Sequence, residues 1–131
     1  MTIFNYLLMI LVWIFYGVAT PHIADDQTRT CPTYEATLAL HGLDPDVFSR
    51  IMYRESRCES WQINEDDPNG GSFGLLQINA IHLADMRLHP DKWAGVERCQ
   101  VKTTGDLLIG WRNICFANYL YIRGGGAPWN L

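Results

Sequence analysis

Apolar residues recur every three to four positions after Asp44, and this pattern predicts a helix over residues 44–57. Asp44 is a favourable N-cap, and Pro45 suits the first helical position because an N–H would have no partner there. The expected buried stripe consists of Val47, Phe48, Ile51 and Met52. Another face carries Arg50, Arg54 and Arg57. Because the stripe continues to Glu55, the helix is expected to turn its arginines to solvent and one glutamate towards the apolar side.

Glu55 is therefore the candidate catalytic residue of the chain. A carboxyl group in an apolar setting has its charged form disfavoured, which predicts a raised pKa. A raised pKa is what a general acid that works near neutral pH requires. Two other interpretations of the spacing remain: a buried glutamate satisfied by hydrogen bonds, or a side chain that swings out at the helix end.

The pattern predicts further elements on both sides of this helix. A short helix over residues 33–40, capped by Thr33 and ended by Gly42, precedes it in a helical hairpin. A loop with strong turn chemistry follows over residues 61–71, and residues 72–79 alternate like a short strand or hairpin arm. A helix over 80–88, a loop over 91–102 and a long helix from Thr103 or Thr104 complete the chain. The apolar stripe of the long helix is expected to contain Leu107, Leu108, Trp111, Ile114, Cys115 and Ile122.

Residues 1–19 are expected to be a signal peptide or an N-terminal anchor. The run over residues 6–18 is nearly all apolar, and Gly17-Val18-Ala19 offers a cleavage site of small residues. The run is short for a bilayer span. Residues 20–30 then form a linker and residues 31–131 one domain that is secreted, periplasmic or extracellular. The membrane is expected as a partner only if this N-terminal segment is not cleaved.

Four cysteines follow this segment, namely Cys31, Cys58, Cys99 and Cys115. An even number in a small exported domain suggests two disulfides, for which three pairings are possible. The helical hairpin places Cys31 and Cys58 at the same end, which predicts the pairs Cys31–Cys58 and Cys99–Cys115. A zinc site is the competing interpretation, but the chain has no Cys-x-x-Cys spacing.

Charge narrows the possible partners of the protein. The net charge is −4 at pH 7, and all charged residues follow the apolar segment, so this is not a basic nucleic-acid binder. His82 and His89 are expected to be ordinary surface histidines. The sequence therefore predicts no metal and no cofactor, and the domain is expected to be a monomer.

The stretch from residue 53 to 79 resembles the lysozyme-like lytic transglycosylase domain and its goose-type lysozyme relatives. The resemblance rests on the pair Glu55-Ser56 closing a helix, the Gly-rich turn after it, and Gly-Leu-Leu-Gln-Ile-Asn over residues 74–79. It implies an α+β fold, mainly helical, with a small β-hairpin region beside the catalytic helix. It also implies cleavage of the β-1,4 bond between N-acetylmuramic acid and N-acetylglucosamine in a peptidoglycan strand, with Glu55 as general acid and base.

The resemblance further implies roles for individual residues. The positions expected to contact substrate are Ser56, Ser72, Gly74, Gln77 and Asn79. Gly74 allows a backbone or a ligand to approach closely. Asp106 and Asn113 fit the long helix of the family, in which Asn113 is expected to form structural hydrogen bonds. Trp129 is expected either to stack on a sugar ring or to attach the tail to the core.

The mechanism has two possible forms. An inverting hydrolase needs a second carboxylate about 6.5–9.5 Å away to activate water, and Asp67 is the candidate. Goose-type lysozymes carry an acid at the end of the strand, where this chain has Asn79, an amide that cannot act as a base. The pattern therefore favours lytic transglycosylation, in which the substrate's own hydroxyl attacks. A glycan-binding domain without catalysis and a disulfide-linked structural domain are the other classes that stay open.

Overall fold

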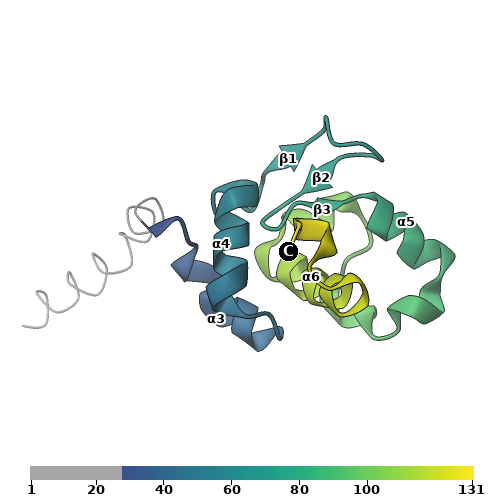
Figure 1. Ribbon diagram of the computed structural model, residues 1–131. Coiled ribbons are helices and arrows are strands. Elements are labelled where there is room, and N and C mark those ends of the chain that lie inside the picture. The colour runs from purple at the N-terminus through teal and green to yellow at the C-terminus, as the bar shows by residue number, and fades with distance from the viewer. Residues whose placement is uncertain (1–27) are drawn as a thin grey trace, which may run out of the picture.

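The computed structural model describes residues 28–131, which form a mainly helical structure with a small antiparallel sheet (Figure 1). The α-helices are α3 (Pro32–Leu40), α4 (Pro45–Ser56), α5 (Ile81–Leu88) and α6 (Gly110–Gly124). The strands are β1 (Ile63–Asn64), β2 (Ser72–Phe73) and β3 (Ile78–Asn79). Short 3-10 helices are η1 (Pro90–Trp93), η2 (Val96–Cys99), η3 (Thr104–Leu108) and η4 (Ala127–Trp129). The expected α+β, mainly helical class is confirmed.

The predicted signal peptide or anchor at residues 1–19 lies outside the described residues, as does most of the linker. Within residues 28–131, no helix combines the length and apolar character needed to cross a membrane. The same part of the chain contains two disulfides, which are typical of an oxidising compartment such as the periplasm or the extracellular space.

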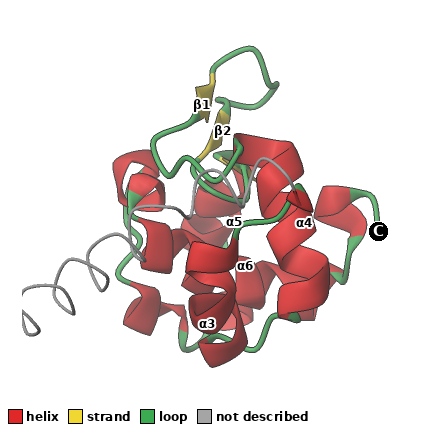
Figure 2. Cartoon of the chain, turned by 90° about the vertical axis from the view of Figure 1, so that its left-hand side faces the viewer, coloured by secondary structure: helices red, strands yellow, loops and turns green. Residues whose placement is uncertain are grey.

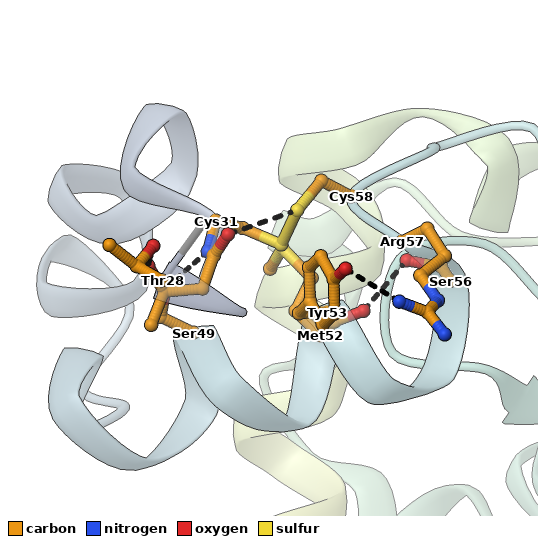
Figure 3. Close-up of a disulfide and its surroundings, with 9 residues drawn as sticks. Thr28, Cys31, Ser49, Met52, Tyr53, Ser56, Arg57 and Cys58 are labelled. Carbon is orange, nitrogen blue, oxygen red and sulfur yellow. Dashed lines mark hydrogen bonds between the residues drawn. A yellow bond between two sulfur atoms is a disulfide. The ribbon is translucent and has the colours of Figure 1, made fainter. Parts of the chain in front are cut away.

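Helices α3 and α4 form the expected helical hairpin (Figure 1). Asp44 caps α4 as predicted, since its Oδ1 accepts a 3.0 Å hydrogen bond from the Asp46 N–H. The predicted cap of α3 is wrong, because Cys31 is the N-cap residue and no side chain caps this helix. The Cys31 N–H instead donates a 2.6 Å hydrogen bond to Ser49 Oγ in α4 (Figure 3). This bond ties the start of α3 to the middle of α4.

Both predicted disulfides are confirmed. Cys31–Cys58, with a Cα–Cα distance of 5.6 Å, joins the start of α3 to the chain just after α4 (Figure 3). Cys99–Cys115, at 5.4 Å, joins η2 to α6. The first disulfide lies at the end of α4 that carries Glu55. Because all four cysteines are bonded to each other, they are not zinc ligands.

The single long helix expected near the C-terminus is interrupted. Thr103 and Asp106 form a capping box that begins η3, and this short helix ends at Leu108, before Ile109, whose backbone is extended. The regular helix α6 begins only at the next residue. Trp111 and Ile122, which the sequence places in the buried stripe, are exposed. The buried residues of α6 are Asn113, Ile114, Cys115, Phe116, Ala117 and Leu120.

The core lies around α6, which Figure 2 shows among the other helices with the sheet above them. The α6 residue Phe116 stacks on Trp93 with ring centroids 5.0 Å apart. On the α4 side, Phe48 packs edge to face against Tyr121 at 5.3 Å. The predicted stripe of α4 is buried at Phe48, Ile51 and Met52, whereas Val47 is exposed.

Residues 72–79 form a β-hairpin rather than one strand. Strands β2 and β3 pair antiparallel, with Ser72 opposite Asn79, and β1 pairs with the other edge of β2. The alternation of faces expected from the sequence fails in the connecting turn, where Leu75 and Leu76 are consecutive and both fully buried. The turn is buried because it packs onto the core.

The side chain of Asn113 in α6 holds this turn in place. Its Oδ1 accepts a 3.0 Å hydrogen bond from the Leu76 N–H, and its Nδ2 donates 2.9 Å bonds to the carbonyls of Phe73 and Leu107. Gly74 has φ +78° and lies against the same group, so a Cβ there would overlap the Leu107 carbonyl and the Asn113 amide. The expectation that Asn113 forms structural hydrogen bonds is confirmed.

Candidate active site

A pocket of about 300 Å³ opens between the end of α4, the β2–β3 hairpin, the start of α5 and the C-terminal turn η4. Figure 1 shows that the C-terminal turn lies beside β3. The lining residues are Glu55, Asp67, Pro68, Ser72, Gln77, Ile78, Asn79, His82, Leu120, Pro128 and Trp129. The fold thus brings together most of the site residues that the sequence analysis identifies.

Glu55 lies in the last turn of α4, with 27% of its side chain exposed. Its Oε1 accepts two hydrogen bonds from Arg54, 2.9 Å from Nη2 and 3.1 Å from Nε. The Nη2 of Arg54 also donates a 2.7 Å bond to the main-chain oxygen of Trp129. Arg54 is half exposed, but it is not the free solvent-facing arginine that the helical pattern predicts. Its guanidinium balances the charge of Glu55 and attaches the C-terminal turn.

The hairpin wall of the pocket is organised by Asn79. Its Nδ2 donates a 2.8 Å hydrogen bond to the Pro68 carbonyl and a 3.4 Å bond to Ser72 Oγ. Its Oδ1 accepts a 2.9 Å bond from the Ile81 N–H at the start of α5. Both ends of the amide are therefore used to join the preceding loop, β2 and α5.

Gln77 and Ser72 leave hydrogen-bonding capacity on this wall. Gln77 has a left-handed backbone, with φ 48°. Its Nε2 donates bonds of 3.0 Å and 3.2 Å to the carbonyls of Gly74 and Gln62. Among residues 28–131, nothing donates to Gln77 Oε1 and nothing accepts the Ser72 hydroxyl proton. The wall therefore offers one acceptor and one donor.

Asp67 provides the second carboxyl group of the pocket. It lies in the loop between β1 and β2, where its main-chain oxygen accepts a 3.1 Å hydrogen bond from the Gly71 N–H and closes the predicted turn. In the described part of the chain, the Asp67 carboxylate forms no salt bridge. The pocket thus contains one arginine-paired carboxylate and one without a charged partner.

Three of the residues identified from the sequence have other surroundings. Ser56 is buried and its Oγ donates a 3.0 Å bond to the Met52 carbonyl, so it does not line the pocket. Gly74 packs against α6, as described above, and does not line the pocket either. Trp129 does line it, but the residue is only 2% exposed and its Nε1 donates a 2.9 Å bond to the Leu76 carbonyl. These contacts attach the tail to the core.

Sequence reasoning missed His82, which lines the pocket from the first turn of α5. The expectation of a surface histidine is wrong, because the side chain is half-buried. Burial lowers the pKa of His82, and the nearby Asp85 offsets part of this effect. The imidazole is therefore neutral at pH 7. Its position three residues after Asn79, at the start of a helix that follows the hairpin, is the signal that could have identified it.

His82, Leu120 and Pro128 also line a neighbouring hollow of about 740 Å³. This hollow extends between α5, η1 and the end of α6 and is lined on that side by Trp93 and Arg123. Because the two cavities share lining residues, a substrate longer than the first pocket has room to continue into the second.

Comparisons with protein family models, with curated proteins and with solved structures give no match. Within residues 28–131, no three His, Cys, Asp or Glu side chains are grouped as metal ligands would be. The pocket itself presents two carboxyl groups, a neutral imidazole and free hydrogen-bonding groups on the hairpin. This set is suited to proton transfer on a polar substrate that carries hydrogen-bonding groups.

Proposed function

We propose that this protein is a peptidoglycan lytic transglycosylase with a lysozyme-like fold. It cleaves the β-1,4 bond between N-acetylmuramic acid and N-acetylglucosamine, with Glu55 as the general acid and base. The observation that carries the proposal is that Glu55 lines one pocket together with Ser72 and Gln77. The resemblance of residues 53–79 to the lytic transglycosylase domain gives this arrangement its chemical interpretation.

The hairpin wall has the polarity that an N-acetyl group requires. A secondary amide presents one N–H donor and one carbonyl acceptor. Gln77 Oε1 can accept from the amide N–H, and the Ser72 hydroxyl can donate to the amide oxygen. The pocket volume of about 300 Å³ is also at the lower end of the range for small-ligand sites. These features favour an acetamido sugar over a sugar without the amide.

In the proposed reaction, the Glu55 carboxyl group protonates the glycosidic oxygen while the bond to the anomeric carbon breaks. The Glu55 carboxylate then takes the proton from the C6 hydroxyl of the same muramic acid, and that oxygen forms the new bond to the anomeric carbon. The product is an anhydro sugar, no water is consumed, and Glu55 is protonated again. Between the two steps, Arg54 stabilises the carboxylate as an opposite charge at hydrogen-bond distance.

Hydrolysis, as in goose-type lysozymes, is the second candidate. It is favoured by the presence of Asp67 in the same pocket, since a second carboxylate can activate a water molecule. It is disfavoured by Asn79, whose amide is engaged on both sides and has no basic oxygen. A glycan-binding domain without catalysis would use the same hairpin wall but would not need the carboxylate of Glu55.

The proposal is tested with the variant Glu55→Gln on purified murein. The wild-type protein is expected to release soluble fragments, and the variant is expected to lose at least about a hundredfold in rate because the amide cannot donate the proton. Glu65→Gln is the matched control, because Glu65 is exposed and does not line the pocket. Wild-type activity in Glu55→Gln would refute the assignment of the acid. Murein binding by a wild-type protein that releases nothing would favour the glycan-binding domain.

Mass spectrometry of the fragments distinguishes the two reactions. Anhydro-muramyl ends are expected for the transglycosylase, whereas reducing ends would identify a hydrolase. Asp67→Asn adds a second criterion: the rate should fall modestly if the substrate's hydroxyl is the nucleophile. A loss as severe as that of Glu55→Gln, together with reducing ends, would establish Asp67 as the base for water.

A further inference from the structure

Four arginines converge on one cavity of a chain whose net charge is −4. The cavity has a volume of about 600 Å³. It is lined by Thr28, Arg29, Arg50, Tyr53, Arg54 and Arg57, which include no acidic residue. The whole chain has 10 Lys and Arg residues, so a large share of its positive charge gathers at this cavity. We name it the arginine pocket.

Helix α4 and a disulfide hold these arginines together. Arg50 and Arg54 lie four positions apart on one face of α4. Arg57 is the C-cap residue of this helix, has a left-handed backbone, and lines the same cavity. Arg29 comes from the segment before α3. The Cys31–Cys58 disulfide joins that segment to the end of α4, close in sequence to both Arg29 and Arg57 (Figure 3). The disulfide therefore holds the backbone of the segment that carries Arg29 close to the end of α4.

The positive charge of the arginine pocket is only partly balanced. Arg54 is paired with Glu55, at the boundary with the candidate active site. Arg57 lies 4.6 Å from the Tyr53 ring centroid and donates a 2.5 Å hydrogen bond to the Tyr53 hydroxyl, so it is oriented without being neutralised (Figure 3). Within residues 28–131, Arg29 and Arg50 form no salt bridge. An excess of positive charge therefore remains in a concave, polar site.

We propose that the arginine pocket binds a phosphate group. The planar guanidinium matches two phosphate oxygens with parallel N–H donors, which makes arginine the preferred residue for phosphate recognition. A doubly charged anion also uses several convergent arginines better than a singly charged carboxylate does. The phosphate group belongs to a soluble phosphate ester or to a phospholipid headgroup. This binding does not depend on the proposed glycosidase activity.

Titration of the full-length chain with inorganic phosphate tests the proposal, in a buffer without phosphate and at constant ionic strength. Calorimetry or arginine side-chain NMR is expected to show saturable binding that is tighter than that of acetate. Arg50→Gln and Arg57→Gln should each weaken the affinity about tenfold, because each removes a charged hydrogen-bond donor. An absence of saturable phosphate binding, or equal affinity for acetate, would overturn the proposal.

Arg98→Gln is the matched control for these variants. Arg98 also stacks on a tyrosine, with its guanidinium carbon 5.2 Å from the Tyr119 ring centroid, but it does not line the arginine pocket. The Arg98→Gln variant removes the same charge from the same kind of arginine–tyrosine pair, but outside the arginine pocket. Its phosphate affinity should therefore stay within about twofold of wild type. A loss as large as that of Arg57→Gln would show that only the net charge matters and would overturn the proposal.

Vesicles distinguish the two sources of phosphate. The full-length chain is compared on phosphatidylcholine vesicles with and without phosphatidylglycerol, so that any contribution of the apolar N-terminal segment is common to both. Stronger binding to the anionic vesicles that Arg50→Gln abolishes and Arg98→Gln retains would identify a lipid headgroup. Phosphate binding without a preference for anionic vesicles would identify a soluble phosphate ester. Both results support the pocket, whereas vesicle binding that is equal in all variants, without phosphate binding, contradicts it.

Discussion

Arg54 donates a 2.7 Å hydrogen bond to the main-chain oxygen of Trp129, which is 75 positions further along the chain. The same guanidinium nitrogen is 2.9 Å from Oε1 of Glu55. One side chain thus connects the end of α4 with the C-terminal turn, and both of these segments line the candidate active site. The turn is fixed a second time by the indole of Trp129, which reaches the Leu76 carbonyl. Pro128 and Trp129 of the C-terminal turn therefore form one wall of the pocket.

Arg54→Gln is expected to loosen this wall. Because the ion pair with Glu55 is partly exposed, it contributes little, and the loss of the bond to Trp129 should dominate. We expect a loss of about 1 kcal/mol in the free energy of unfolding. Faster hydrogen exchange is expected at the amides of Trp129 and Asn130, which are bonded within the turn. Arg50→Gln in phosphate-free buffer is the control, and a change of the same size in both variants would contradict this explanation.

Gly74→Ala is expected to disrupt the hairpin that carries Ser72 and Gln77. The new methyl group would overlap the Leu107 carbonyl and the Asn113 amide, and the backbone has φ +78°. We expect the free energy of unfolding to fall by about 3 kcal/mol, because of the crowding and the unfavourable φ together. Gly42→Ala separates the two causes, because Gly42 has nearly the same φ, +77°, but the atom nearest to the added methyl group is Asn118 Oδ1 at 3.4 Å, an ordinary contact. Chemical denaturation of this control variant should show a loss of only about 1 kcal/mol in the free energy of unfolding. An equal loss in the control and in Gly74→Ala would mean that the contact of Gly74 with α6 does not matter.

The parts of the fold that follow from local chemistry could be predicted from the sequence. Helix α4 has an N-cap aspartate, a proline at its first position and a regular apolar stripe, so its limits and most of its buried face were accessible. The disulfide pairs followed because a helical hairpin brings its two ends together, whatever the packing behind it. The position of Glu55 in the last turn of α4 could be predicted from the same helical pattern.

The parts that depend on tertiary contacts could not be predicted in this way. The turn between β2 and β3 buries two consecutive leucines because Asn113, far along the chain, satisfies its backbone groups. Periodicity assigns Arg54 to solvent, since it carries no information on the C-terminal turn that this side chain contacts. His82 was missed because the pocket that it lines is formed together with the hairpin and the C-terminal turn, which the periodicity of α5 does not reveal.

The two disulfides should contribute unequally to stability. In the chain-entropy model, the 27-residue separation of Cys31–Cys58 predicts about 3.5 kcal/mol, and the 16-residue separation of Cys99–Cys115 predicts about 3 kcal/mol. Paired alanine variants of each disulfide, unfolded in urea, measure these values.

The arginine pocket adds a second difference between the disulfides, because only loss of Cys31–Cys58 should also weaken phosphate binding. Phosphate affinity that falls equally in both double variants would contradict the role of this disulfide in holding Arg29 near α4.

The lowered pKa of His82 predicts that the stability of the protein depends on pH in the mildly acidic range. Burial lowers the folded-state pKa of His82 below the unfolded value of about 6.5. Between the two pKa values, the unfolded chain binds more protons than the folded one, so stability falls as the pH is lowered from 7 through the unfolded pKa. The free energy of unfolding of His82→Gln, measured by denaturant titration between pH 7 and pH 5, should therefore fall less than that of wild type. The His82→Gln variant should keep part of the pH dependence, because burial and Arg98 also lower the pKa of His41. The His41→Gln variant should remove that remaining part. If His82→Gln keeps the full wild-type slope, the imidazole is solvated in the folded protein and does not form the wall of the pocket described here.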